Sequence, residues 1–66
     1  MRISLNGSPR DVRDEGTLLS LLQELGIDPR RAAVALNSEV VPRGDLAART
    51  PADGDAVEII EAVGGG

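Results

Sequence analysis

The sequence predicts an α+β domain in which one β-sheet is covered on one face by one main helix. Three observations support this class: two strand-like stretches that are each followed by a turn signal and a return segment, one leucine-rich stretch with helical spacing, and one strongly strand-like run near the end. At 66 residues, the chain has room for a single small hydrophobic core. We therefore expect one domain, built in the order hairpin, helix, hairpin, short helical turn and strand.

The first hairpin is predicted at the start of the chain. Residues 2–6 alternate polar and apolar side chains and lead into Asn6-Gly7, a pair typical of two-residue hairpin turns. The return strand is expected at residues 8–13, on an edge of the sheet because Pro9 has no N–H to donate to a neighbour. Three aliphatic side chains are expected on the buried face, namely Ile3, Leu5 and Val12.

The main helix is predicted to begin after Thr17, whose hydroxyl can cap it. Gly26 suits a left-handed stop, and Asp28-Pro29 prevents the helix from continuing. Its apolar residues fall at helical spacing: Leu18, Leu21, Leu22 and Leu25. A partner-binding helix is the alternative for this stretch, but a core helix is favoured because the chain has no other apolar layer to cover its sheet.

The second hairpin is predicted from a strand at residues 32–36, a turn at Asn37-Ser38 and a return strand at residues 39–41, which Pro42 ends. Residues 43–49 have room for one or two helical turns, with Leu46 as their anchor.

The last strand is expected at residues 56–63, after a turn at Asp53-Gly54-Asp55. Two carboxylates around a glycine could suggest a calcium loop, but the other ligand positions of such a loop are missing. Within the strand, Val57 and Ile59 are expected to face the helix, so that Ile60 points away from it.

The composition restricts the classes of function. The chain has no cysteine, which excludes a disulfide framework or a thiolate metal site and fits a cytoplasmic protein. Seven arginines, no lysine and eleven acidic residues give a net charge of −4, the wrong sign for binding nucleic acid or an anionic membrane. The chain does not begin with a secretion signal and has no apolar run near ~18 residues, so we expect neither export nor membrane insertion.

The sequence ends in Gly64-Gly65-Gly66. Glycines have no Cβ and wide backbone freedom, so such a tail can thread a channel that is too narrow for side chains. A frayed terminus is the alternative. Because the triplet directly follows a strand-like run, we favour a tail that the domain presents to a partner.

Several short segments resemble one known family in their order, spacing and total length. These are Leu5-Asn6-Gly7, Thr17-Leu18, Ala35-Leu36-Asn37, Val41-Pro42-Arg43, Asp53-Gly54-Asp55 and the final Gly65-Gly66. The chain resembles the thiamine-pathway sulfur carriers, the ThiS family of the ubiquitin-like β-grasp superfamily. The resemblance implies a mixed five-stranded sheet of order 2-1-5-3-4 with parallel central strands, a domain at residues 1–63 and a flexible tail at residues 64–66.

The resemblance also implies a function. A partner of the ubiquitin-activating type, an adenylyltransferase of the ThiF type, would use ATP and metal to adenylate the Gly66 carboxylate. Sulfur from a cysteine persulfide would then give a thiocarboxylate, which a thiazole synthase of the ThiG type would consume. The chain itself is expected to be a monomeric carrier without catalytic side chains, bound cofactor or metal.

Within this scheme, Gly66 is the modified residue, and Gly64 and Gly65 thread into the partners with it. The candidate partner contacts are Ile60, Val63 and Arg43. Two alternatives remain open: a carrier for another acceptor, in molybdopterin synthesis, tRNA thiolation or a cysteine pathway, and a β-grasp module that only binds.

Overall fold

The computed structural model describes residues 1–62 and confirms the α+β class. Its strands are β1 (Arg2–Leu5), β2 (Ser8–Asp11), β3 (Ala32–Leu36), β4 (Glu39–Val41) and β5 (Ala56–Glu61). The helix is α1 (Leu18–Leu25), and two 3-10 helices are η1 (Pro29–Arg31) and η2 (Arg43–Asp45). Among these residues, no helix has the length and apolarity needed to cross a membrane.

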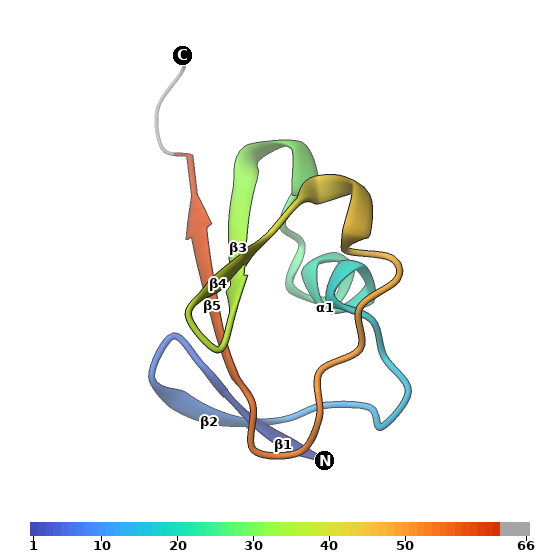
Figure 1. Cartoon of the computed structure of the whole chain (residues 1–66), viewed down its shortest axis with the longest axis vertical. Helices are drawn as coiled ribbons and strands as arrows, with labels where there is room; N and C mark the ends of the chain where they lie inside the picture. The colour runs from blue at the N-terminus through green and yellow to red at the C-terminus, as the bar shows by residue number, and fades with distance from the viewer. Residues whose placement is uncertain (63–66) are drawn as a thin grey trace.

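The five strands form one sheet in the order β2-β1-β5-β3-β4, as the resemblance implied (Figure 1). The central pair, β1 and β5, is parallel, and the other pairs are antiparallel. The two return strands, β2 and β4, lie at the edges, as Pro9 predicted for the first of them. The last strand in the chain therefore lies between the two hairpins.

The ends of α1 follow from its sequence. The Thr17 hydroxyl accepts a hydrogen bond from the Ser20 N–H at 3.1 Å and caps the first turn. At the other end, Gly26 is left-handed, with φ of 72°, and the Ile27 N–H donates back to the Leu22 carbonyl at 2.9 Å. Both predicted boundaries of the helix are confirmed.

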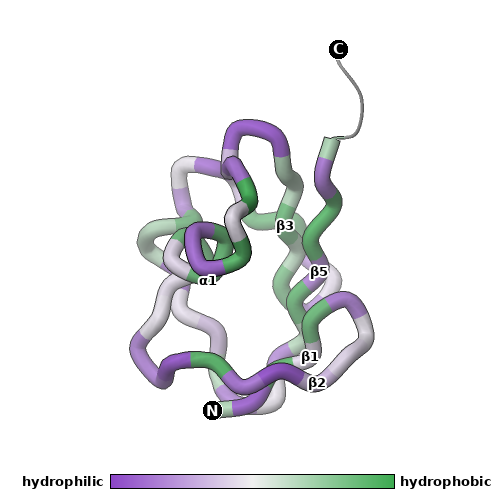
Figure 2. The backbone as a smooth tube through the Cα atoms, turned by 180° about the vertical axis from the view of Figure 1, so that it is seen from behind, coloured by the Kyte–Doolittle hydropathy of each residue, from purple (hydrophilic) through white to green (hydrophobic). Residues whose placement is uncertain are grey.

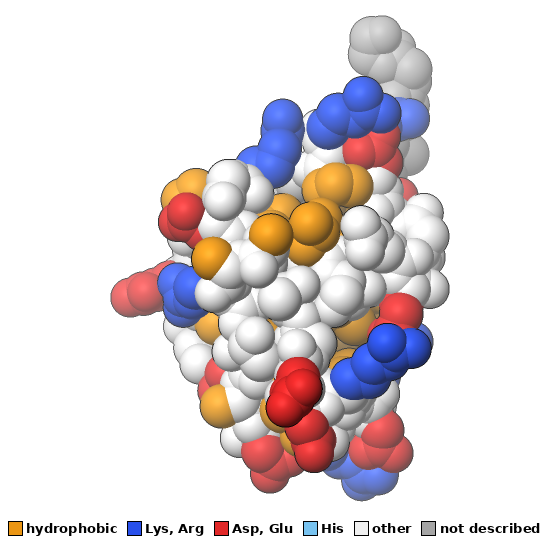
Figure 3. All heavy atoms as spheres, turned by 90° about the vertical axis from the view of Figure 1, so that its right-hand side faces the viewer, with side chains coloured by type: hydrophobic (Ala, Val, Ile, Leu, Met, Phe, Trp, Pro, Cys, Tyr) orange, Lys and Arg blue, Asp and Glu red, His pale blue; other side chains and the backbone are white. Residues whose placement is uncertain are grey.

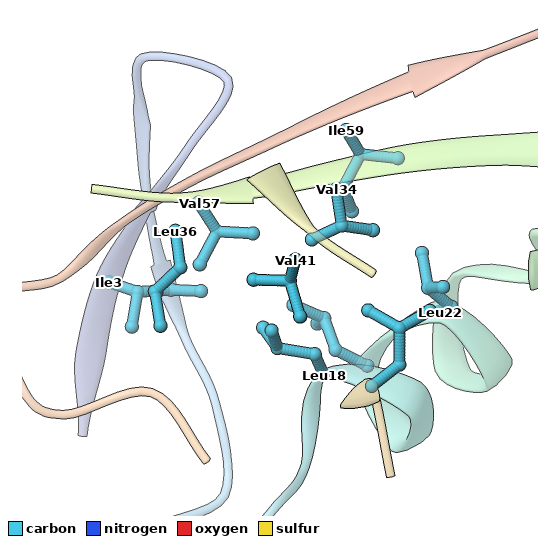
Figure 4. Close-up of a cluster of buried hydrophobic side chains, with 10 residues drawn as sticks. Ile3, Leu18, Leu22, Val34, Leu36, Val41, Val57 and Ile59 are labelled. Carbon is cyan, nitrogen blue, oxygen red and sulfur yellow. The ribbon is translucent and has the colours of Figure 1, made fainter. Parts of the chain in front are cut away.

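The core lies between α1 and one face of the sheet. Figure 4 shows Leu18 and Leu22 of the helix opposite strand side chains that include Val34, Val57 and Ile59. Ten of the described residues form this buried cluster: Ile3, Leu18, Leu21, Leu22, Val34, Leu36, Val41, Leu46, Val57 and Ile59. Figure 2 shows the same pattern along the chain, with hydrophobic segments in the helix and central strands and hydrophilic segments in the loops.

The helix stripe and the buried positions of the first hairpin are largely confirmed. Leu46 is buried, as its predicted anchor role requires. Leu5, Val12 and Leu25 are half-buried and pack against the cluster.

Two strand ends differ from the prediction. The return strand of the first hairpin ends at Asp11 rather than at residue 13, because its partner strand begins at Arg2, which is paired with Asp11. Likewise, β5 ends at Glu61, which pairs with Ala32, the first residue of β3. Before Ala32 the chain turns into η1, so a longer β5 would have no strand beside it. The predicted strand residue Val63 lies outside the described residues.

Candidate functional site

The face of the sheet opposite α1 is open, and the register of the strands identifies its residues. On β5 and β3, Ile60 pairs with Ala33, and Glu58 pairs with Ala35. On β3 and β4, Ala35 also pairs with Val40. Because neighbouring residues in a strand alternate between faces, these residues point away from the core that Ile59 and Val34 help to form. We call Ile60, Ala33, Ala35 and Val40 the open apolar face.

The open apolar face exposes two large aliphatic side chains. Ile60 is 69% exposed and Val40 is 74% exposed. The prediction that Ile60 points away from the helix is therefore confirmed. Small alanines lie between them, so an apolar strip runs across β5, β3 and β4 beside Glu58, and exposed apolar patches of this kind mark surfaces for protein partners. Sequence analysis named only Ile60. The alternation of small and large side chains in residues 32–36 indicates Ala33 and Ala35, but Val40 and Val41 are the same residue type and only the register separates them.

Arginines lie beside this face, at the end of the sheet where β5 stops. The Ala62 N–H donates to the Arg31 carbonyl at 2.7 Å, which places the end of the described chain against η1. The Arg43 guanidinium donates to the Arg30 carbonyl at 3.2 Å, so η2 lies against η1 as well. Figure 3 shows several basic side chains at this end of the molecule with an acidic side chain among them, and more acidic than basic side chains toward the opposite end. We call the three arginines at this end, Arg30, Arg31 and Arg43, the basic rim; the Arg30 guanidinium is ion-paired with Asp28 at 3.1 Å.

Several acidic side chains of the described residues accept hydrogen bonds in turns or form ion pairs. Asp53 accepts from the Arg2 N–H at 2.8 Å, and Asp55 accepts from the Ala52 N–H at 2.8 Å and the Asn37 side chain at 3.1 Å. These two hydrogen bonds, that from Ala52 first, lower the pKa of the Asp55 carboxyl. The predicted plain turn at residues 53–55 is confirmed. In residues 1–62 no three His, Cys, Asp or Glu side chains gather in a group that could hold a metal ion.

Asn6, which sequence analysis assigned only to a turn, holds β5 near its end. The Asn6 Oδ1 accepts a hydrogen bond from the Ile59 N–H at 2.8 Å, and the Asn6 Nδ2 donates to the Ile59 carbonyl at 3.2 Å. The two residues are 53 positions apart in the sequence. Their contact depends on the parallel pairing of β1 and β5, so no local pattern indicates it.

The structure places two of the predicted site residues at the same end of the sheet. Ile60 lies on the open apolar face, and Arg43 is exposed on η2, with its hydrogen bond directed to η1 rather than to β5. The predicted tail and its root lie outside the described residues: Val63, Gly64, Gly65 and Gly66.

Comparisons with known proteins point to one family. The sequence model of the ThiS family matches residues 3–66. The sulfur carrier protein ThiS of Thermus thermophilus is 37% identical over 62 residues, which are 94% of this chain and 95% of that protein. The crystal structure of the thiamine biosynthesis protein ThiS from Geobacter metallireducens is 36% identical and matches with a TM-score of 0.84 over 100% of both chains.

Two longer proteins are also similar. Thiazole synthases of Paramagnetospirillum magneticum and Magnetococcus marinus are 41% and 39% identical to this chain over 66 residues. All of this chain is matched in both cases, but it spans only 20% of each synthase.

Proposed function

This chain belongs to the ThiS family of sulfur carriers in thiamine biosynthesis, and we propose that it carries sulfur as a thiocarboxylate on Gly66 and acts as a cytoplasmic monomer. The observation that supports this most strongly is the match of the family model across residues 3–66, which includes the final glycines. Thiazole synthase is the proposed acceptor, because two proteins of that name contain a segment similar to this whole chain.

The chemistry requires activation of a carboxylate. A C-terminal carboxyl group has a pKa of about 3.3–3.7, so at neutral pH it is an anion without a leaving group. In the proposed first step, a carboxylate oxygen of Gly66 attacks the α-phosphate of ATP, and pyrophosphate leaves. The terminal sulfur of a persulfide then attacks the carbonyl carbon, and AMP leaves. Finally, a thiol of the partner cleaves the sulfur–sulfur bond and releases the thiocarboxylate.

The carrier supplies position rather than catalysis in these steps. Two anions meet in the adenylation, so cationic groups and metal must stand where charge develops. We assign these groups, and the ATP site, to the adenylyltransferase. Gly64, Gly65 and Gly66 contribute a narrow backbone that fits beside them, and no side chain of the carrier takes part.

The proposed docking surface for the adenylyltransferase is the open apolar face with its basic rim. Ile60 and Val40 offer apolar area, and Arg43 offers a cation for an acidic group at the edge of the contact. This surface lies at the root of the tail, so contacts there would offset the entropy lost when the glycines are ordered. A modest contact area also suits a carrier that leaves one enzyme for the next.

The experiment that tests the function is sulfur loading followed by intact-mass spectrometry. The chain, ending at Gly66, is incubated with ATP, a ThiF-type adenylyltransferase and a persulfide donor. We expect its mass to rise by the difference between one sulfur and one oxygen atom. A variant with one residue added after Gly66 is the control and should stay unchanged. An unchanged mass for the parent chain, with a partner that loads another carrier, would refute the proposal.

A further inference from the structure

We propose that Asn6 is a positioning residue for the reaction at the tail: its side-chain amide fixes the direction in which β5 leaves the sheet. The inference rests on the proposed function, because the tail is the part that reacts. It goes beyond that function by assigning a role to a residue in the turn of the first hairpin, which is far from the tail in sequence.

The β1 side of β5 loses its main-chain partner before the strand ends. Pairing between the two strands covers Ser4 with Ala56 and Leu5 with Val57. The Asn6 N–H then donates to the Val57 carbonyl at 2.9 Å, and the chain turns away into the hairpin. From this point on, no residue of β1 runs beside β5.

The side chain of Asn6 replaces the missing strand. A primary amide has one acceptor and two donor hydrogens in a plane, so it can bond both the N–H and the C=O of one residue, as a strand neighbour does. The Asn6 amide forms both bonds with Ile59: its oxygen accepts from the Ile59 N–H at 2.8 Å, and its nitrogen donates to the Ile59 carbonyl at 3.2 Å. The turn permits this, since Asn6 is left-handed, with φ of 49°.

Beyond Ile59, β5 is held on the β3 side. There Ile60 pairs with Ala33 and Glu61 with Ala32, and the Ala62 N–H donates to the Arg31 carbonyl at 2.7 Å. A strand held along one edge can rotate about that edge. The Asn6 amide opposes this rotation at Ile59, directly before the docking residue Ile60, and so fixes the position of Ile60 and of the end of β5 that precedes the tail.

The second hairpin supplies a matched control. Asn37 is also left-handed, with φ of 50°, and its Oδ1 accepts from the Ala56 N–H at 2.9 Å. This contact holds the start of β5, far along the strand from the tail. Asn6→Gly and Asn37→Gly both keep the left-handed turn accessible and both remove the side-chain contact with β5.

The test compares these two variants in the loading reaction, at a temperature where circular dichroism shows both to be folded. Removing the Asn6 amide should lower kcat/KM for the carrier about tenfold, mainly through KM, and removing Asn37 should change it by less than about twofold. Asn6→Asp, which keeps the acceptor and loses the donor, is the second variant and should cause a smaller fall.

Amide hydrogen exchange gives an independent measurement. The Ile59 and Ala62 N–H groups should exchange faster in Asn6→Gly than in Asn37→Gly. Equal losses of kcat/KM in the two variants, or unchanged exchange at Ala62 in Asn6→Gly, would overturn the positioning role. If the parent chain gains no sulfur, the proposed function is refuted, and with it the role of Asn6 in the reaction. The exchange rate at Ile59 still tests whether the Asn6 amide holds β5.

Discussion

β5 begins inside a closed hydrogen-bond network and ends with strand pairing on one side. At its start, the Ala56 N–H donates to the Asn37 side chain, and the Asn37 N–H donates to the Ala56 carbonyl at 2.7 Å. Ser4 pairs with Ala56 from the other side, and the Ser4 N–H donates to the Asp55 carbonyl at 2.9 Å. Main-chain and side-chain groups from both hairpins thus hold this end.

The end of β5 has β3 on one side and a single amide, that of Asn6, on the other. Its outward side chain, Ile60, is exposed rather than packed. The contrast teaches that one strand can serve two purposes. Its start stabilises the sheet, and in the proposed function its end presents a surface to partner proteins.

The largest expected effect is on stability, at the start of β5. Val57 is buried, and Val57→Ala should lower the free energy of unfolding by about 2 kcal/mol, through lost burial and the cavity left behind. Ile60→Ala should cost less than about 0.5 kcal/mol because the side chain is already in solvent. Urea denaturation followed by circular dichroism measures both. Similar losses would show that the two ends do not differ in packing.

The next effect is on the interaction with partners, at the end of β5. Ile60→Asp should lower the efficiency of sulfur loading by about tenfold, because a charge would be buried in the docking surface. Ser4→Asp is the control: it adds the same charge on the same face of the sheet, beside Ala56. Collapse of the thermal transition in Ile60→Asp would mean that Ile60 belongs to the core. Equal loading by both variants would remove Ile60 from the docking surface.

Exchanging residues between the two turns should have a smaller effect. Gly7 and Ser38 occupy the second turn position, with φ of 86° and 71°. Gly7→Ser should cost about 1 kcal/mol of stability, and Ser38→Gly should add up to about 1 kcal/mol, because side chains disfavour this conformation. A Cβ on Gly7 would meet nothing within 4 Å, so the cost is conformational. Thermal denaturation would contradict this if neither midpoint moved, or if both moved in the same direction.

The smallest effect is a pH dependence of the network at the start of β5. Because the pKa of the Asp55 carboxyl is lowered in the folded state, its charged form adds stability above the ordinary pKa of about 3.9. This stability is lost as the pH falls through the lower folded value. Asp55→Asn should therefore flatten the fall of the melting temperature between neutral pH and pH values near 3, relative to the parent chain. If the melting temperature of Asp55→Asn falls with pH as steeply as that of the parent chain, the Asp55 carboxylate does not contribute to the acid sensitivity of the fold.

The elements with local signals were predictable from the sequence. The Thr17 cap, the Gly26 stop and the Asn6-Gly7 turn each act within a few residues, so their effect can be read from neighbouring positions. Local signals do not specify the complete strand order, which the family resemblance implied. The end of β5 was predicted too late, because it depends on where β3 begins, at Ala32.

The candidate site was predictable only in part. Ile60 was identified from the alternation within its own strand. The open apolar face requires the register of three strands, which places Val40 and Ala33 on the same face as Ile60. The contact between Asn6 and Ile59 requires the parallel pairing of distant segments, and the basic rim requires η1 and η2 to meet. Charge counted along the whole sequence gave the sign of the net charge but not its distribution.

The position of β5 between the two hairpins has a consequence for folding kinetics. Neither hairpin pairs with the other, so the sheet stays in two separate pieces until the last strand is in place. Chains with many contacts between distant segments fold slowly, because loop closure must precede the contacts that compensate for it. During synthesis, the sheet can therefore be completed only after β5 has been made. A chain that stops short of β5 lacks both the completed sheet and the glycines that follow it.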